Sequence, residues 1–225
     1  VRRCIRERLY EKGFKIDPLA MIGPATAQQL GDIGNPIEYV DDDLFGFLVP
    51  KEKGLTVKRV SPIKTSHLIS LRHAEIKVEF AGRFPREFIE NYQKGFPAPF
   101  EVEVAEWIGK LNIIVSDRVG KFYEDELMED LKQHSQLIKE DGIYSLPVEE
   151  RIKRLRGLLE ILLMEGWAFP RSAHSPSVPE FYYSVISLTE SFIPLFGFID
   201  ITNEGEINLD LLNNFKKTYK NLIDE

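Results

Sequence analysis

The spacing of apolar residues changes at Leu55 from about four residues to two, and no other feature constrains the fold as strongly. Before this point, Ile5 and Leu9 fall on one face of a predicted amphipathic helix. After it come short alternating or β-branched runs, which are typical of strands. Strands are predicted at 55–60, 63–71, 75–80, 100–104, 110–116, 181–188 and 194–200.

Helix-start and helix-stop residues place further helices on either side of these strands. Asn35, Pro36 and Glu38 suit the N-cap, first and third positions of a helix that ends near Leu44. A short helix is predicted at 26–30, before Gly31. Pro147 begins a long helix that ends at Gly166. We expect its buried stripe to be Val148, Ile152, Leu155, Leu159 and Leu162.

The order of these elements predicts an α+β fold. A closing amphipathic helix is indicated by Leu209, Leu212, Phe215, Tyr219 and Leu222. With 225 residues and 43% apolar content, the chain can bury one sizeable core. We therefore expect a single domain over 1–225, interrupted by three insertions. These are a helical one at about 13–54, a proline- and aromatic-rich one at 82–99 and an acidic one at 123–146.

Composition bounds the compartment and the partners. No run of about 18 apolar residues occurs, so no membrane span is expected. Cys4 is the single cysteine, which fits a reducing compartment, and we expect the cytoplasm. The net charge is −7, but residues 1–97 carry 16 Lys and Arg against 13 Asp and Glu. A local basic groove can hold nucleic acid even when the whole chain is acidic.

The sequence contains no recognisable catalytic constellation. Asp41, Asp42 and Asp43 are consecutive, so they point in different directions along a helix, and a solvated helix end is expected there. The four histidines have no metal-ligand spacing, and phosphate-cradling or nucleophile-elbow motifs are missing. We therefore expect no enzyme activity, no catalytic residue, no metal and no cofactor.

Cationic residues in three separate segments make a better functional case. Each of these cationic segments, taken alone, is more often an ordinary solvated surface. They support a binding site only if folding brings them together. Two arginines that lie four positions apart on a helix share a face and can bind successive phosphates. Cations that border a pair of strands can bind the backbone of single-stranded RNA. The candidate RNA-binding residues are Arg2, Arg3 and Arg6; Lys58, Arg59, Lys64 and His67; and Arg171, Ser172 and His174.

Five segments, in order, carry a resemblance to one family. They are VRRCIRERL, LFGFL with VKRVSPIKTSHLISL, EIKVEFAGRF with PFEVEVAEWIGKLNIIVS, EERIKRLRGLLEILLMEG and FPRSAHSP. Together they resemble the CRISPR RNA-binding backbone subunits of Cascade effector complexes, the DevR-like and Csa-like family. The resemblance implies a modified RNA-recognition (ferredoxin-like) antiparallel sheet, with 82–99 as a protruding thumb. The family's first strand would precede Val1, so the sheet is expected to lack it.

The resemblance also implies a role and partners. Family members form helical oligomers along a CRISPR RNA in type I complexes for antiviral defence, and target DNA is then read by base pairing with the guide. The implied partners are CRISPR RNA, target DNA through the guide, other copies of the chain and other Cascade subunits. Two alternatives stay open. One is a metal-dependent nuclease using Asp41–Asp43 with His67, and the other is a protein-interaction module with an acidic second half.

Overall fold

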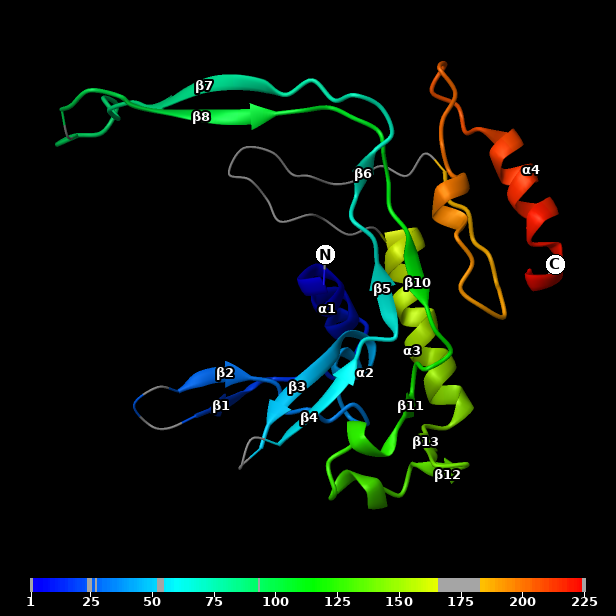
Figure 1. Ribbon diagram of the computed structural model, residues 1–225. Helices are drawn as coiled ribbons and strands as arrows, with labels where there is room; N and C mark the ends of the chain where they lie inside the picture. The colour runs from blue at the N-terminus through cyan, green and yellow to red at the C-terminus, as the bar shows by residue number, and fades with distance from the viewer. Residues whose placement is uncertain are drawn as a thin grey trace. The chain divides into compact units, whose positions relative to one another are not determined.

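The structure, a computed structural model, describes residues 2–23, 26, 28–51, 55–92, 94–165 and 183–223 (Figure 1). The chain divides into two compact units, where a single domain with insertions was expected from the sequence. The first unit comprises 1–65 and 113–184, and the second comprises 66–112 and 185–225. None of the described helices combines the length and apolar character needed to cross a membrane.

The described part of the first unit contains three α-helices. The N-terminal helix and the long helix are confirmed, and the long one continues into a π-helical turn at Ile161–Glu165. The middle helix begins later than predicted, because the Asn35 side chain caps a turn at 36–38 through the amides of Ile37 and Glu38. The bounds are α1 Arg2–Glu11, α2 Val40–Phe45 and α3 Val148–Glu160, with 3₁₀ turns at Glu124–Glu126 and Leu131–Gln133.

The strand pairs that the structure describes in the first unit are antiparallel, in sheets of two or three strands. The α+β class is therefore confirmed. The pairs are β1 Ala20–Ile22 with β2 Gln29–Gly31, β3 Gly46–Pro50 with β4 Thr56–Val60, and β5 Ile63–Thr65 with β10 Ile113–Val115. In a fourth sheet, of three strands, β13 Ile143–Ser145 lies between β11 Lys121–Phe122 and β12 Ile138–Glu140.

The predicted helical character of 13–54 is wrong. Among the described residues of this range only the six of α2 are α-helical, and β2 Gln29–Gly31 lies where the end of the helix at 26–30 was expected. Pairing with β1 explains the difference, because Met21 lies opposite Leu30 in a hairpin and local helix propensity is a weak preference that tertiary pairing overrides.

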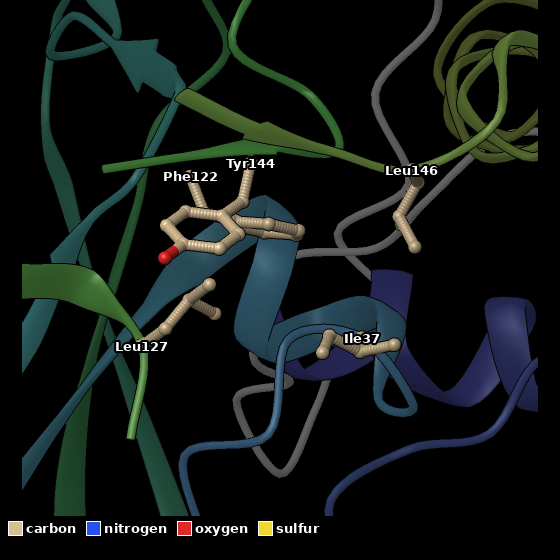
Figure 2. Close-up of a cluster of buried hydrophobic side chains, with 5 residues drawn as sticks. All are labelled: Ile37, Phe122, Leu127, Tyr144 and Leu146. Carbon is tan, nitrogen blue, oxygen red and sulfur yellow. The ribbon is translucent and has the colours of Figure 1, made fainter. Parts of the chain in front are cut away.

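A compact apolar cluster forms the centre of this unit. Phe122 and Tyr144 come from paired strands β11 and β13, and they lie near one another in Figure 2. Leu127 follows a 3₁₀ turn, Ile37 precedes α2, and Leu146 precedes α3. Segments far apart in sequence are thus held by one core, which fixes the position of α2.

α3 packs against α1 through a face that contains a glycine. A Cβ atom on Gly157 would lie 2.7 Å from the Phe14 ring and 3.6 Å from Leu9, so only glycine allows this close approach. Arg154 and Leu158 are buried on the same face.

The predicted buried stripe of α3 is therefore largely wrong. Val148, Ile152 and Leu159 are 57%, 51% and 38% exposed, and of the stripe only Leu162 is buried. The helix is rotated so that Arg154 and Gly157 face inward, because they make contacts that the apolar stripe cannot make.

In its described residues, the second unit contains two antiparallel strand pairs and a small aromatic core. Phe198, Phe215 and Tyr219 pack with ring centroids 5.2–6.1 Å apart, and the Asn208 side chain caps the closing helix, which is confirmed. The elements are β6 Ile69–Ser70 with β9 Gly109–Lys110, β7 Lys77–Arg83 with β8 Ala98–Val104, a 3₁₀ turn Leu195–Phe198, α4 Leu209–Thr218 and a 3₁₀ turn Lys220–Leu222.

Several strand predictions in these regions need correction. The predicted strands 63–71 and 110–116 are each broken into two short strands. The segment 183–188 has no regular structure, and 195–198 forms a 3₁₀ turn in place of a strand. Phe181 and Tyr182 lie outside the described residues. Prolines explain part of this result, since Pro194 precedes the turn and cannot donate to a strand ladder.

Candidate nucleic-acid interface

Arg2 and Arg6 converge on one aromatic ring at the surface of α1. Their guanidinium carbons lie 5.9 Å and 5.2 Å from the centroid of Phe45, which ends α2. Arg6 Nε also donates to Asp41 Oδ2 at 2.8 Å. Arg2 and Arg6, four positions apart on α1, therefore hold their guanidinium groups side by side through cation–π contacts and one ion pair. Such a pair can bind two phosphate groups of a nucleic acid.

Arg3 points elsewhere. Its Nε lies 3.1 Å from Glu7 Oε1, and its side chain is 92% exposed. Exposed pairs of this kind are weak, so the charge of Arg3 stays available to solvent. α1 therefore offers a pair of arginines above Phe45 and a third on another part of its surface.

Lys58 and Lys64 lie on strands of the same unit. Lys58 is exposed on β4 directly opposite the exposed Leu48 of β3. Lys64 is exposed on β5, opposite Ile114 of β10. An apolar residue beside a cation gives a surface that can contact both a base or sugar and a phosphate.

Arg59 was predicted to face RNA, and this prediction is wrong. Its side chain is fully buried, since side chains alternate along β4 and the exposed Lys58 forces Arg59 inward. Its guanidinium lies 4.6 Å from the centroid of Phe122 and donates to Asp43 and Glu126. A buried, fully bonded guanidinium cannot reach a phosphate.

Asp41, Asp42 and Asp43 are also buried, at 4%, 2% and 0% exposure, so the predicted solvated helix end is wrong. Asp43 receives hydrogen bonds from Arg59 Nη2 at 2.6 Å and from Arg154 Nη1 at 2.9 Å. The amide of Gly120 donates to both of its oxygens. The three carboxylates thus point in different directions, as consecutive helical residues must, but every direction is inward.

Asp42 belongs to a second acidic group that the sequence did not indicate. Carboxylate oxygens of Asp17, Asp32 and Asp42 lie within 4.8 Å of one another, and these are the described side chains that converge closely enough to hold a metal ion. Burial and the charges of Asp17, Asp41 and Asp32 raise the pKa of Asp42 to about 8. The β1–β2 hairpin brings the group together, and that hairpin was not predicted.

The remaining candidates lie in other parts of the chain. His67 belongs to the second unit, where it is exposed between β5 and β6. Arg171, Ser172 and His174 lie outside the described residues. The structure therefore brings together Arg2 and Arg6 and places Lys58 and Lys64 in the same unit.

The β7–β8 hairpin gives the second unit an exposed aromatic surface. Neither strand contains a buried residue, and its end coincides with the insertion predicted at 82–99 (Figure 1). Phe80, Phe88 and Phe96 are 78%, 87% and 101% exposed. A two-stranded hairpin without a buried face is marginal by itself, so this surface suits contact with a partner.

Comparison with known families identifies the chain. No curated protein and no solved structure matches it. A family model described as CRISPR-associated negative auto-regulator DevR/Csa2 matches residues 32–204, which is more than half of the chain. The match covers α2, the β7–β8 hairpin and α3. The chain therefore belongs to the DevR/Csa2 family of CRISPR-associated proteins.

Proposed function

We propose that this chain is a non-catalytic scaffold subunit that binds CRISPR RNA and oligomerises along it in a type I (Cascade) effector complex for antiviral defence. The observation that carries the proposal is the pair of arginines, Arg2 and Arg6, held over Phe45 in a member of the DevR/Csa2 family. The proposed partners are CRISPR RNA, target DNA through the guide, further copies of the chain and other Cascade subunits, in the cytoplasm. The proposed scaffold is a modified RNA-recognition sheet.

The chemistry of the arginine pair supports backbone binding. Arginine donates in a planar fork that matches phosphate, and Phe45 orients both guanidinium groups before RNA arrives. Lys58 adds an exposed cation on β4 of the same unit. Contacts to phosphates carry no sequence information, which suits a subunit that leaves recognition to guide–target base pairing.

The bonding of the consecutive aspartates supports a scaffold over a nuclease. Both oxygens of Asp43 accept hydrogen bonds, and Asp41 accepts from Arg6 and from the amide of Asp17. Carboxylates that activate a metal-bound water need oxygens available to the ion. The carboxylate oxygens of Asp41 and Asp43 already accept hydrogen bonds from within the protein, so we propose no catalytic role for these residues.

The test compares two double variants of α1 that each remove two positive charges. Arg2→Gln/Arg6→Gln removes the pair above Phe45, and Arg3→Gln/Arg8→Gln removes two others from the same helix. RNA affinity is measured by fluorescence anisotropy over a range of salt concentrations. We expect the first variant to lose at least about tenfold in affinity and to reduce the salt slope by about 1–2, and the second to change much less.

Arg6→Gln also removes a partner of Asp41, so Arg2→Gln alone is measured alongside, with circular dichroism as a check on folding. Equal losses in both double variants would mean that only overall charge matters, and this would refute the assigned site. Failure of the unmodified protein to bind RNA at low salt would favour a protein-interaction module.

A further inference from the structure

The two carboxylate oxygens of Asp41 have different partners. Oδ1 accepts from the backbone amide of Asp17 at 2.9 Å, and Oδ2 accepts from Arg6 Nε at 2.8 Å. The Asp41 side chain is 5% exposed. Because the fold fixes the position of the Asp17 amide, the bond to Oδ1 sets the rotation of the carboxylate and directs Oδ2 towards Arg6.

Phe45 lies on the same face of α2 as Asp41, because four positions separate the two residues. Arg6 therefore contacts a carboxylate and an aromatic ring of one helix. Its Nε donates to Asp41, and its guanidinium carbon lies 5.2 Å from the centroid of Phe45. The ion pair and the cation–π contact together restrict the position and the plane of the guanidinium.

The bond to Asp41 determines which donors of Arg6 can reach a ligand. A guanidinium donates through Nε and through its two Nη atoms. In the part of the chain that the structure describes, Arg6 makes no side-chain hydrogen bond other than the one from Nε. Its side chain is 36% exposed. Since Nε is occupied, the two Nη groups remain to donate as a fork to one phosphate.

Arg2 has no comparable constraint. It is exposed on α1 and contacts the Phe45 ring at 5.9 Å. Among the ion pairs of the described residues, none includes Arg2. Arg6 is thus held in place before a ligand arrives, whereas Arg2 can adjust to it. A side chain that is already ordered loses less conformational entropy on binding.

We propose that Asp41 is a positioning residue of the RNA interface, which holds Arg6 so that its two Nη groups bind a backbone phosphate. This inference rests on the proposed function and deepens it. It predicts that an anionic side chain strengthens RNA binding, whereas charge alone predicts that a carboxylate near a phosphate weakens it. Burial explains the difference, because Asp41 has both oxygens bonded inside the protein and faces Arg6 instead of solvent.

The first measurement uses the unmodified protein. Arginine side-chain Nε–H groups are followed by ¹⁵N NMR, and that of Arg6 is expected to exchange with water at least about tenfold more slowly than that of Arg2. Addition of single-stranded RNA should shift the Nη resonances of Arg6 and preserve the protection of its Nε–H. Equal exchange rates of Arg6 and Arg2, or loss of the Arg6 protection when RNA binds, would overturn the inference.

The second measurement compares two variants that each neutralise the carboxylate partner of an arginine in α1. Asp41→Asn affects Arg6, and the matched control Glu7→Gln affects Arg3. Asparagine has an NH₂ group in place of one carboxylate oxygen, so it cannot accept from both the Asp17 amide and Arg6 Nε. RNA affinity is measured by the fluorescence anisotropy assay described above.

Asp41→Asn is expected to weaken RNA binding by about threefold to tenfold, which is the usual effect of losing the order of one long side chain. Glu7→Gln is expected to leave the affinity unchanged or slightly higher. If Asp41→Asn bound RNA as tightly as the unmodified protein or more tightly, the inference would fail while the proposed function would stand. Failure of the unmodified protein to bind RNA would instead refute the proposed function, and the inference with it.

A double-mutant cycle separates positioning from a general effect on the fold. Asp41→Asn is measured alone and together with Arg6→Gln. If Asp41 acts through Arg6, its replacement should cause no further loss of affinity once Arg6 is absent. Equal losses in both backgrounds would mean that Asp41 acts only through the fold, and this would overturn the inference. Circular dichroism checks that each variant is folded, and if Asp41→Asn is not, the exchange rates of the unmodified protein decide.

Discussion

Arg59 Nη2 lies 2.6 Å from Asp43 Oδ1, and both side chains are fully buried. Burial lowers the pKa of Arg59, and the charges of Asp43 and Glu126 oppose that shift. The guanidinium also donates to the carbonyls of Lys121 and Arg118, both at 2.9 Å. A buried ion pair persists only when its donors are satisfied in this way. The network thus fixes β4 and α2 to the segment around 118–126.

Loss of Arg59 should therefore weaken folding more than RNA binding. Arg59→Met leaves Asp43 and Glu126 buried with fewer partners, and we expect the free energy of unfolding to fall by about 3–5 kcal/mol. Lys58→Met, at the neighbouring exposed position, should change it by less than about 0.5 kcal/mol. Urea denaturation followed by circular dichroism measures both, and similar values for the two variants would contradict the structural role of Arg59.

Gly46 connects α2 to β3 in a conformation that only glycine adopts easily. Its φ is 75° and its ψ is 169°, and a Cβ atom would lie 2.3 Å from the Arg59 carbonyl oxygen. We expect Gly46→Ala to reduce the free energy of unfolding by more than about 4 kcal/mol, because the backbone of β4 at Arg59 must move to make room for the Cβ atom.

Gly142→Ala is the matched control for this prediction. Gly142 has a similar φ of 78°, but a Cβ atom there would meet nothing within 4 Å. Backbone strain alone should reduce the free energy of unfolding by about 1–2 kcal/mol. Equal losses in the two variants would show that the contact with Arg59 has no effect.

Local sequence patterns predicted the regular elements well where packing agreed with them. The N-terminal helix, the strand at 55–60 and the closing helix are confirmed. The β1–β2 hairpin was not predictable in this way, because its strands have only three residues each and are defined by pairing. Periodicity also cannot tell which face of α3 is buried when a glycine and an arginine, Gly157 and Arg154, make the decisive contacts.

The exposed apolar stripe of α3 leads to a third prediction. Leu158 is 0% exposed and Leu159 is 38% exposed, although the sequence pattern places Leu159 in the core. We expect Leu158→Ala to lower the free energy of unfolding by about 2–5 kcal/mol and Leu159→Ala by roughly 1 kcal/mol. The same denaturation assay compares them. The reverse order would mean that the predicted stripe, and not the observed face, is buried.

The candidate site was predictable only in part, because the sequence does not show which of its charged residues are buried. Spacing alone predicted that Arg2 and Arg6 share a helix face. It could not show that Arg59 is buried while Lys58 is exposed, since both residues fit a basic strand until the buried face is known. The acidic group of Asp17, Asp32 and Asp42 was missed because Asp17 and Asp32 approach Asp42 only through tertiary structure.

The raised pKa of Asp42 predicts a dependence of stability on pH that is opposite to that of most carboxylates. The folded protein holds the Asp42 proton up to about pH 8, whereas the unfolded chain releases it near the ordinary value of 3.8. The stabilisation is therefore complete below the ordinary value, decreases as pH rises and is lost above about 8. Asp117, whose pKa is lowered by its hydrogen bond to Lys121, contributes in the opposite sense, with stability that is lost in acid.

Comparison with Asp42→Asn isolates this effect. The difference in unfolding free energy, unmodified protein minus variant, should decrease by about 1.4 kcal/mol per pH unit between about pH 5 and pH 7. It should become constant above about pH 9, where Asp42 is ionised in both states. Urea denaturation at several pH values measures the difference, with Asp125→Asn as the control at an exposed aspartate. Parallel curves for the unmodified protein and Asp42→Asn would show that Asp42 is already ionised at neutral pH.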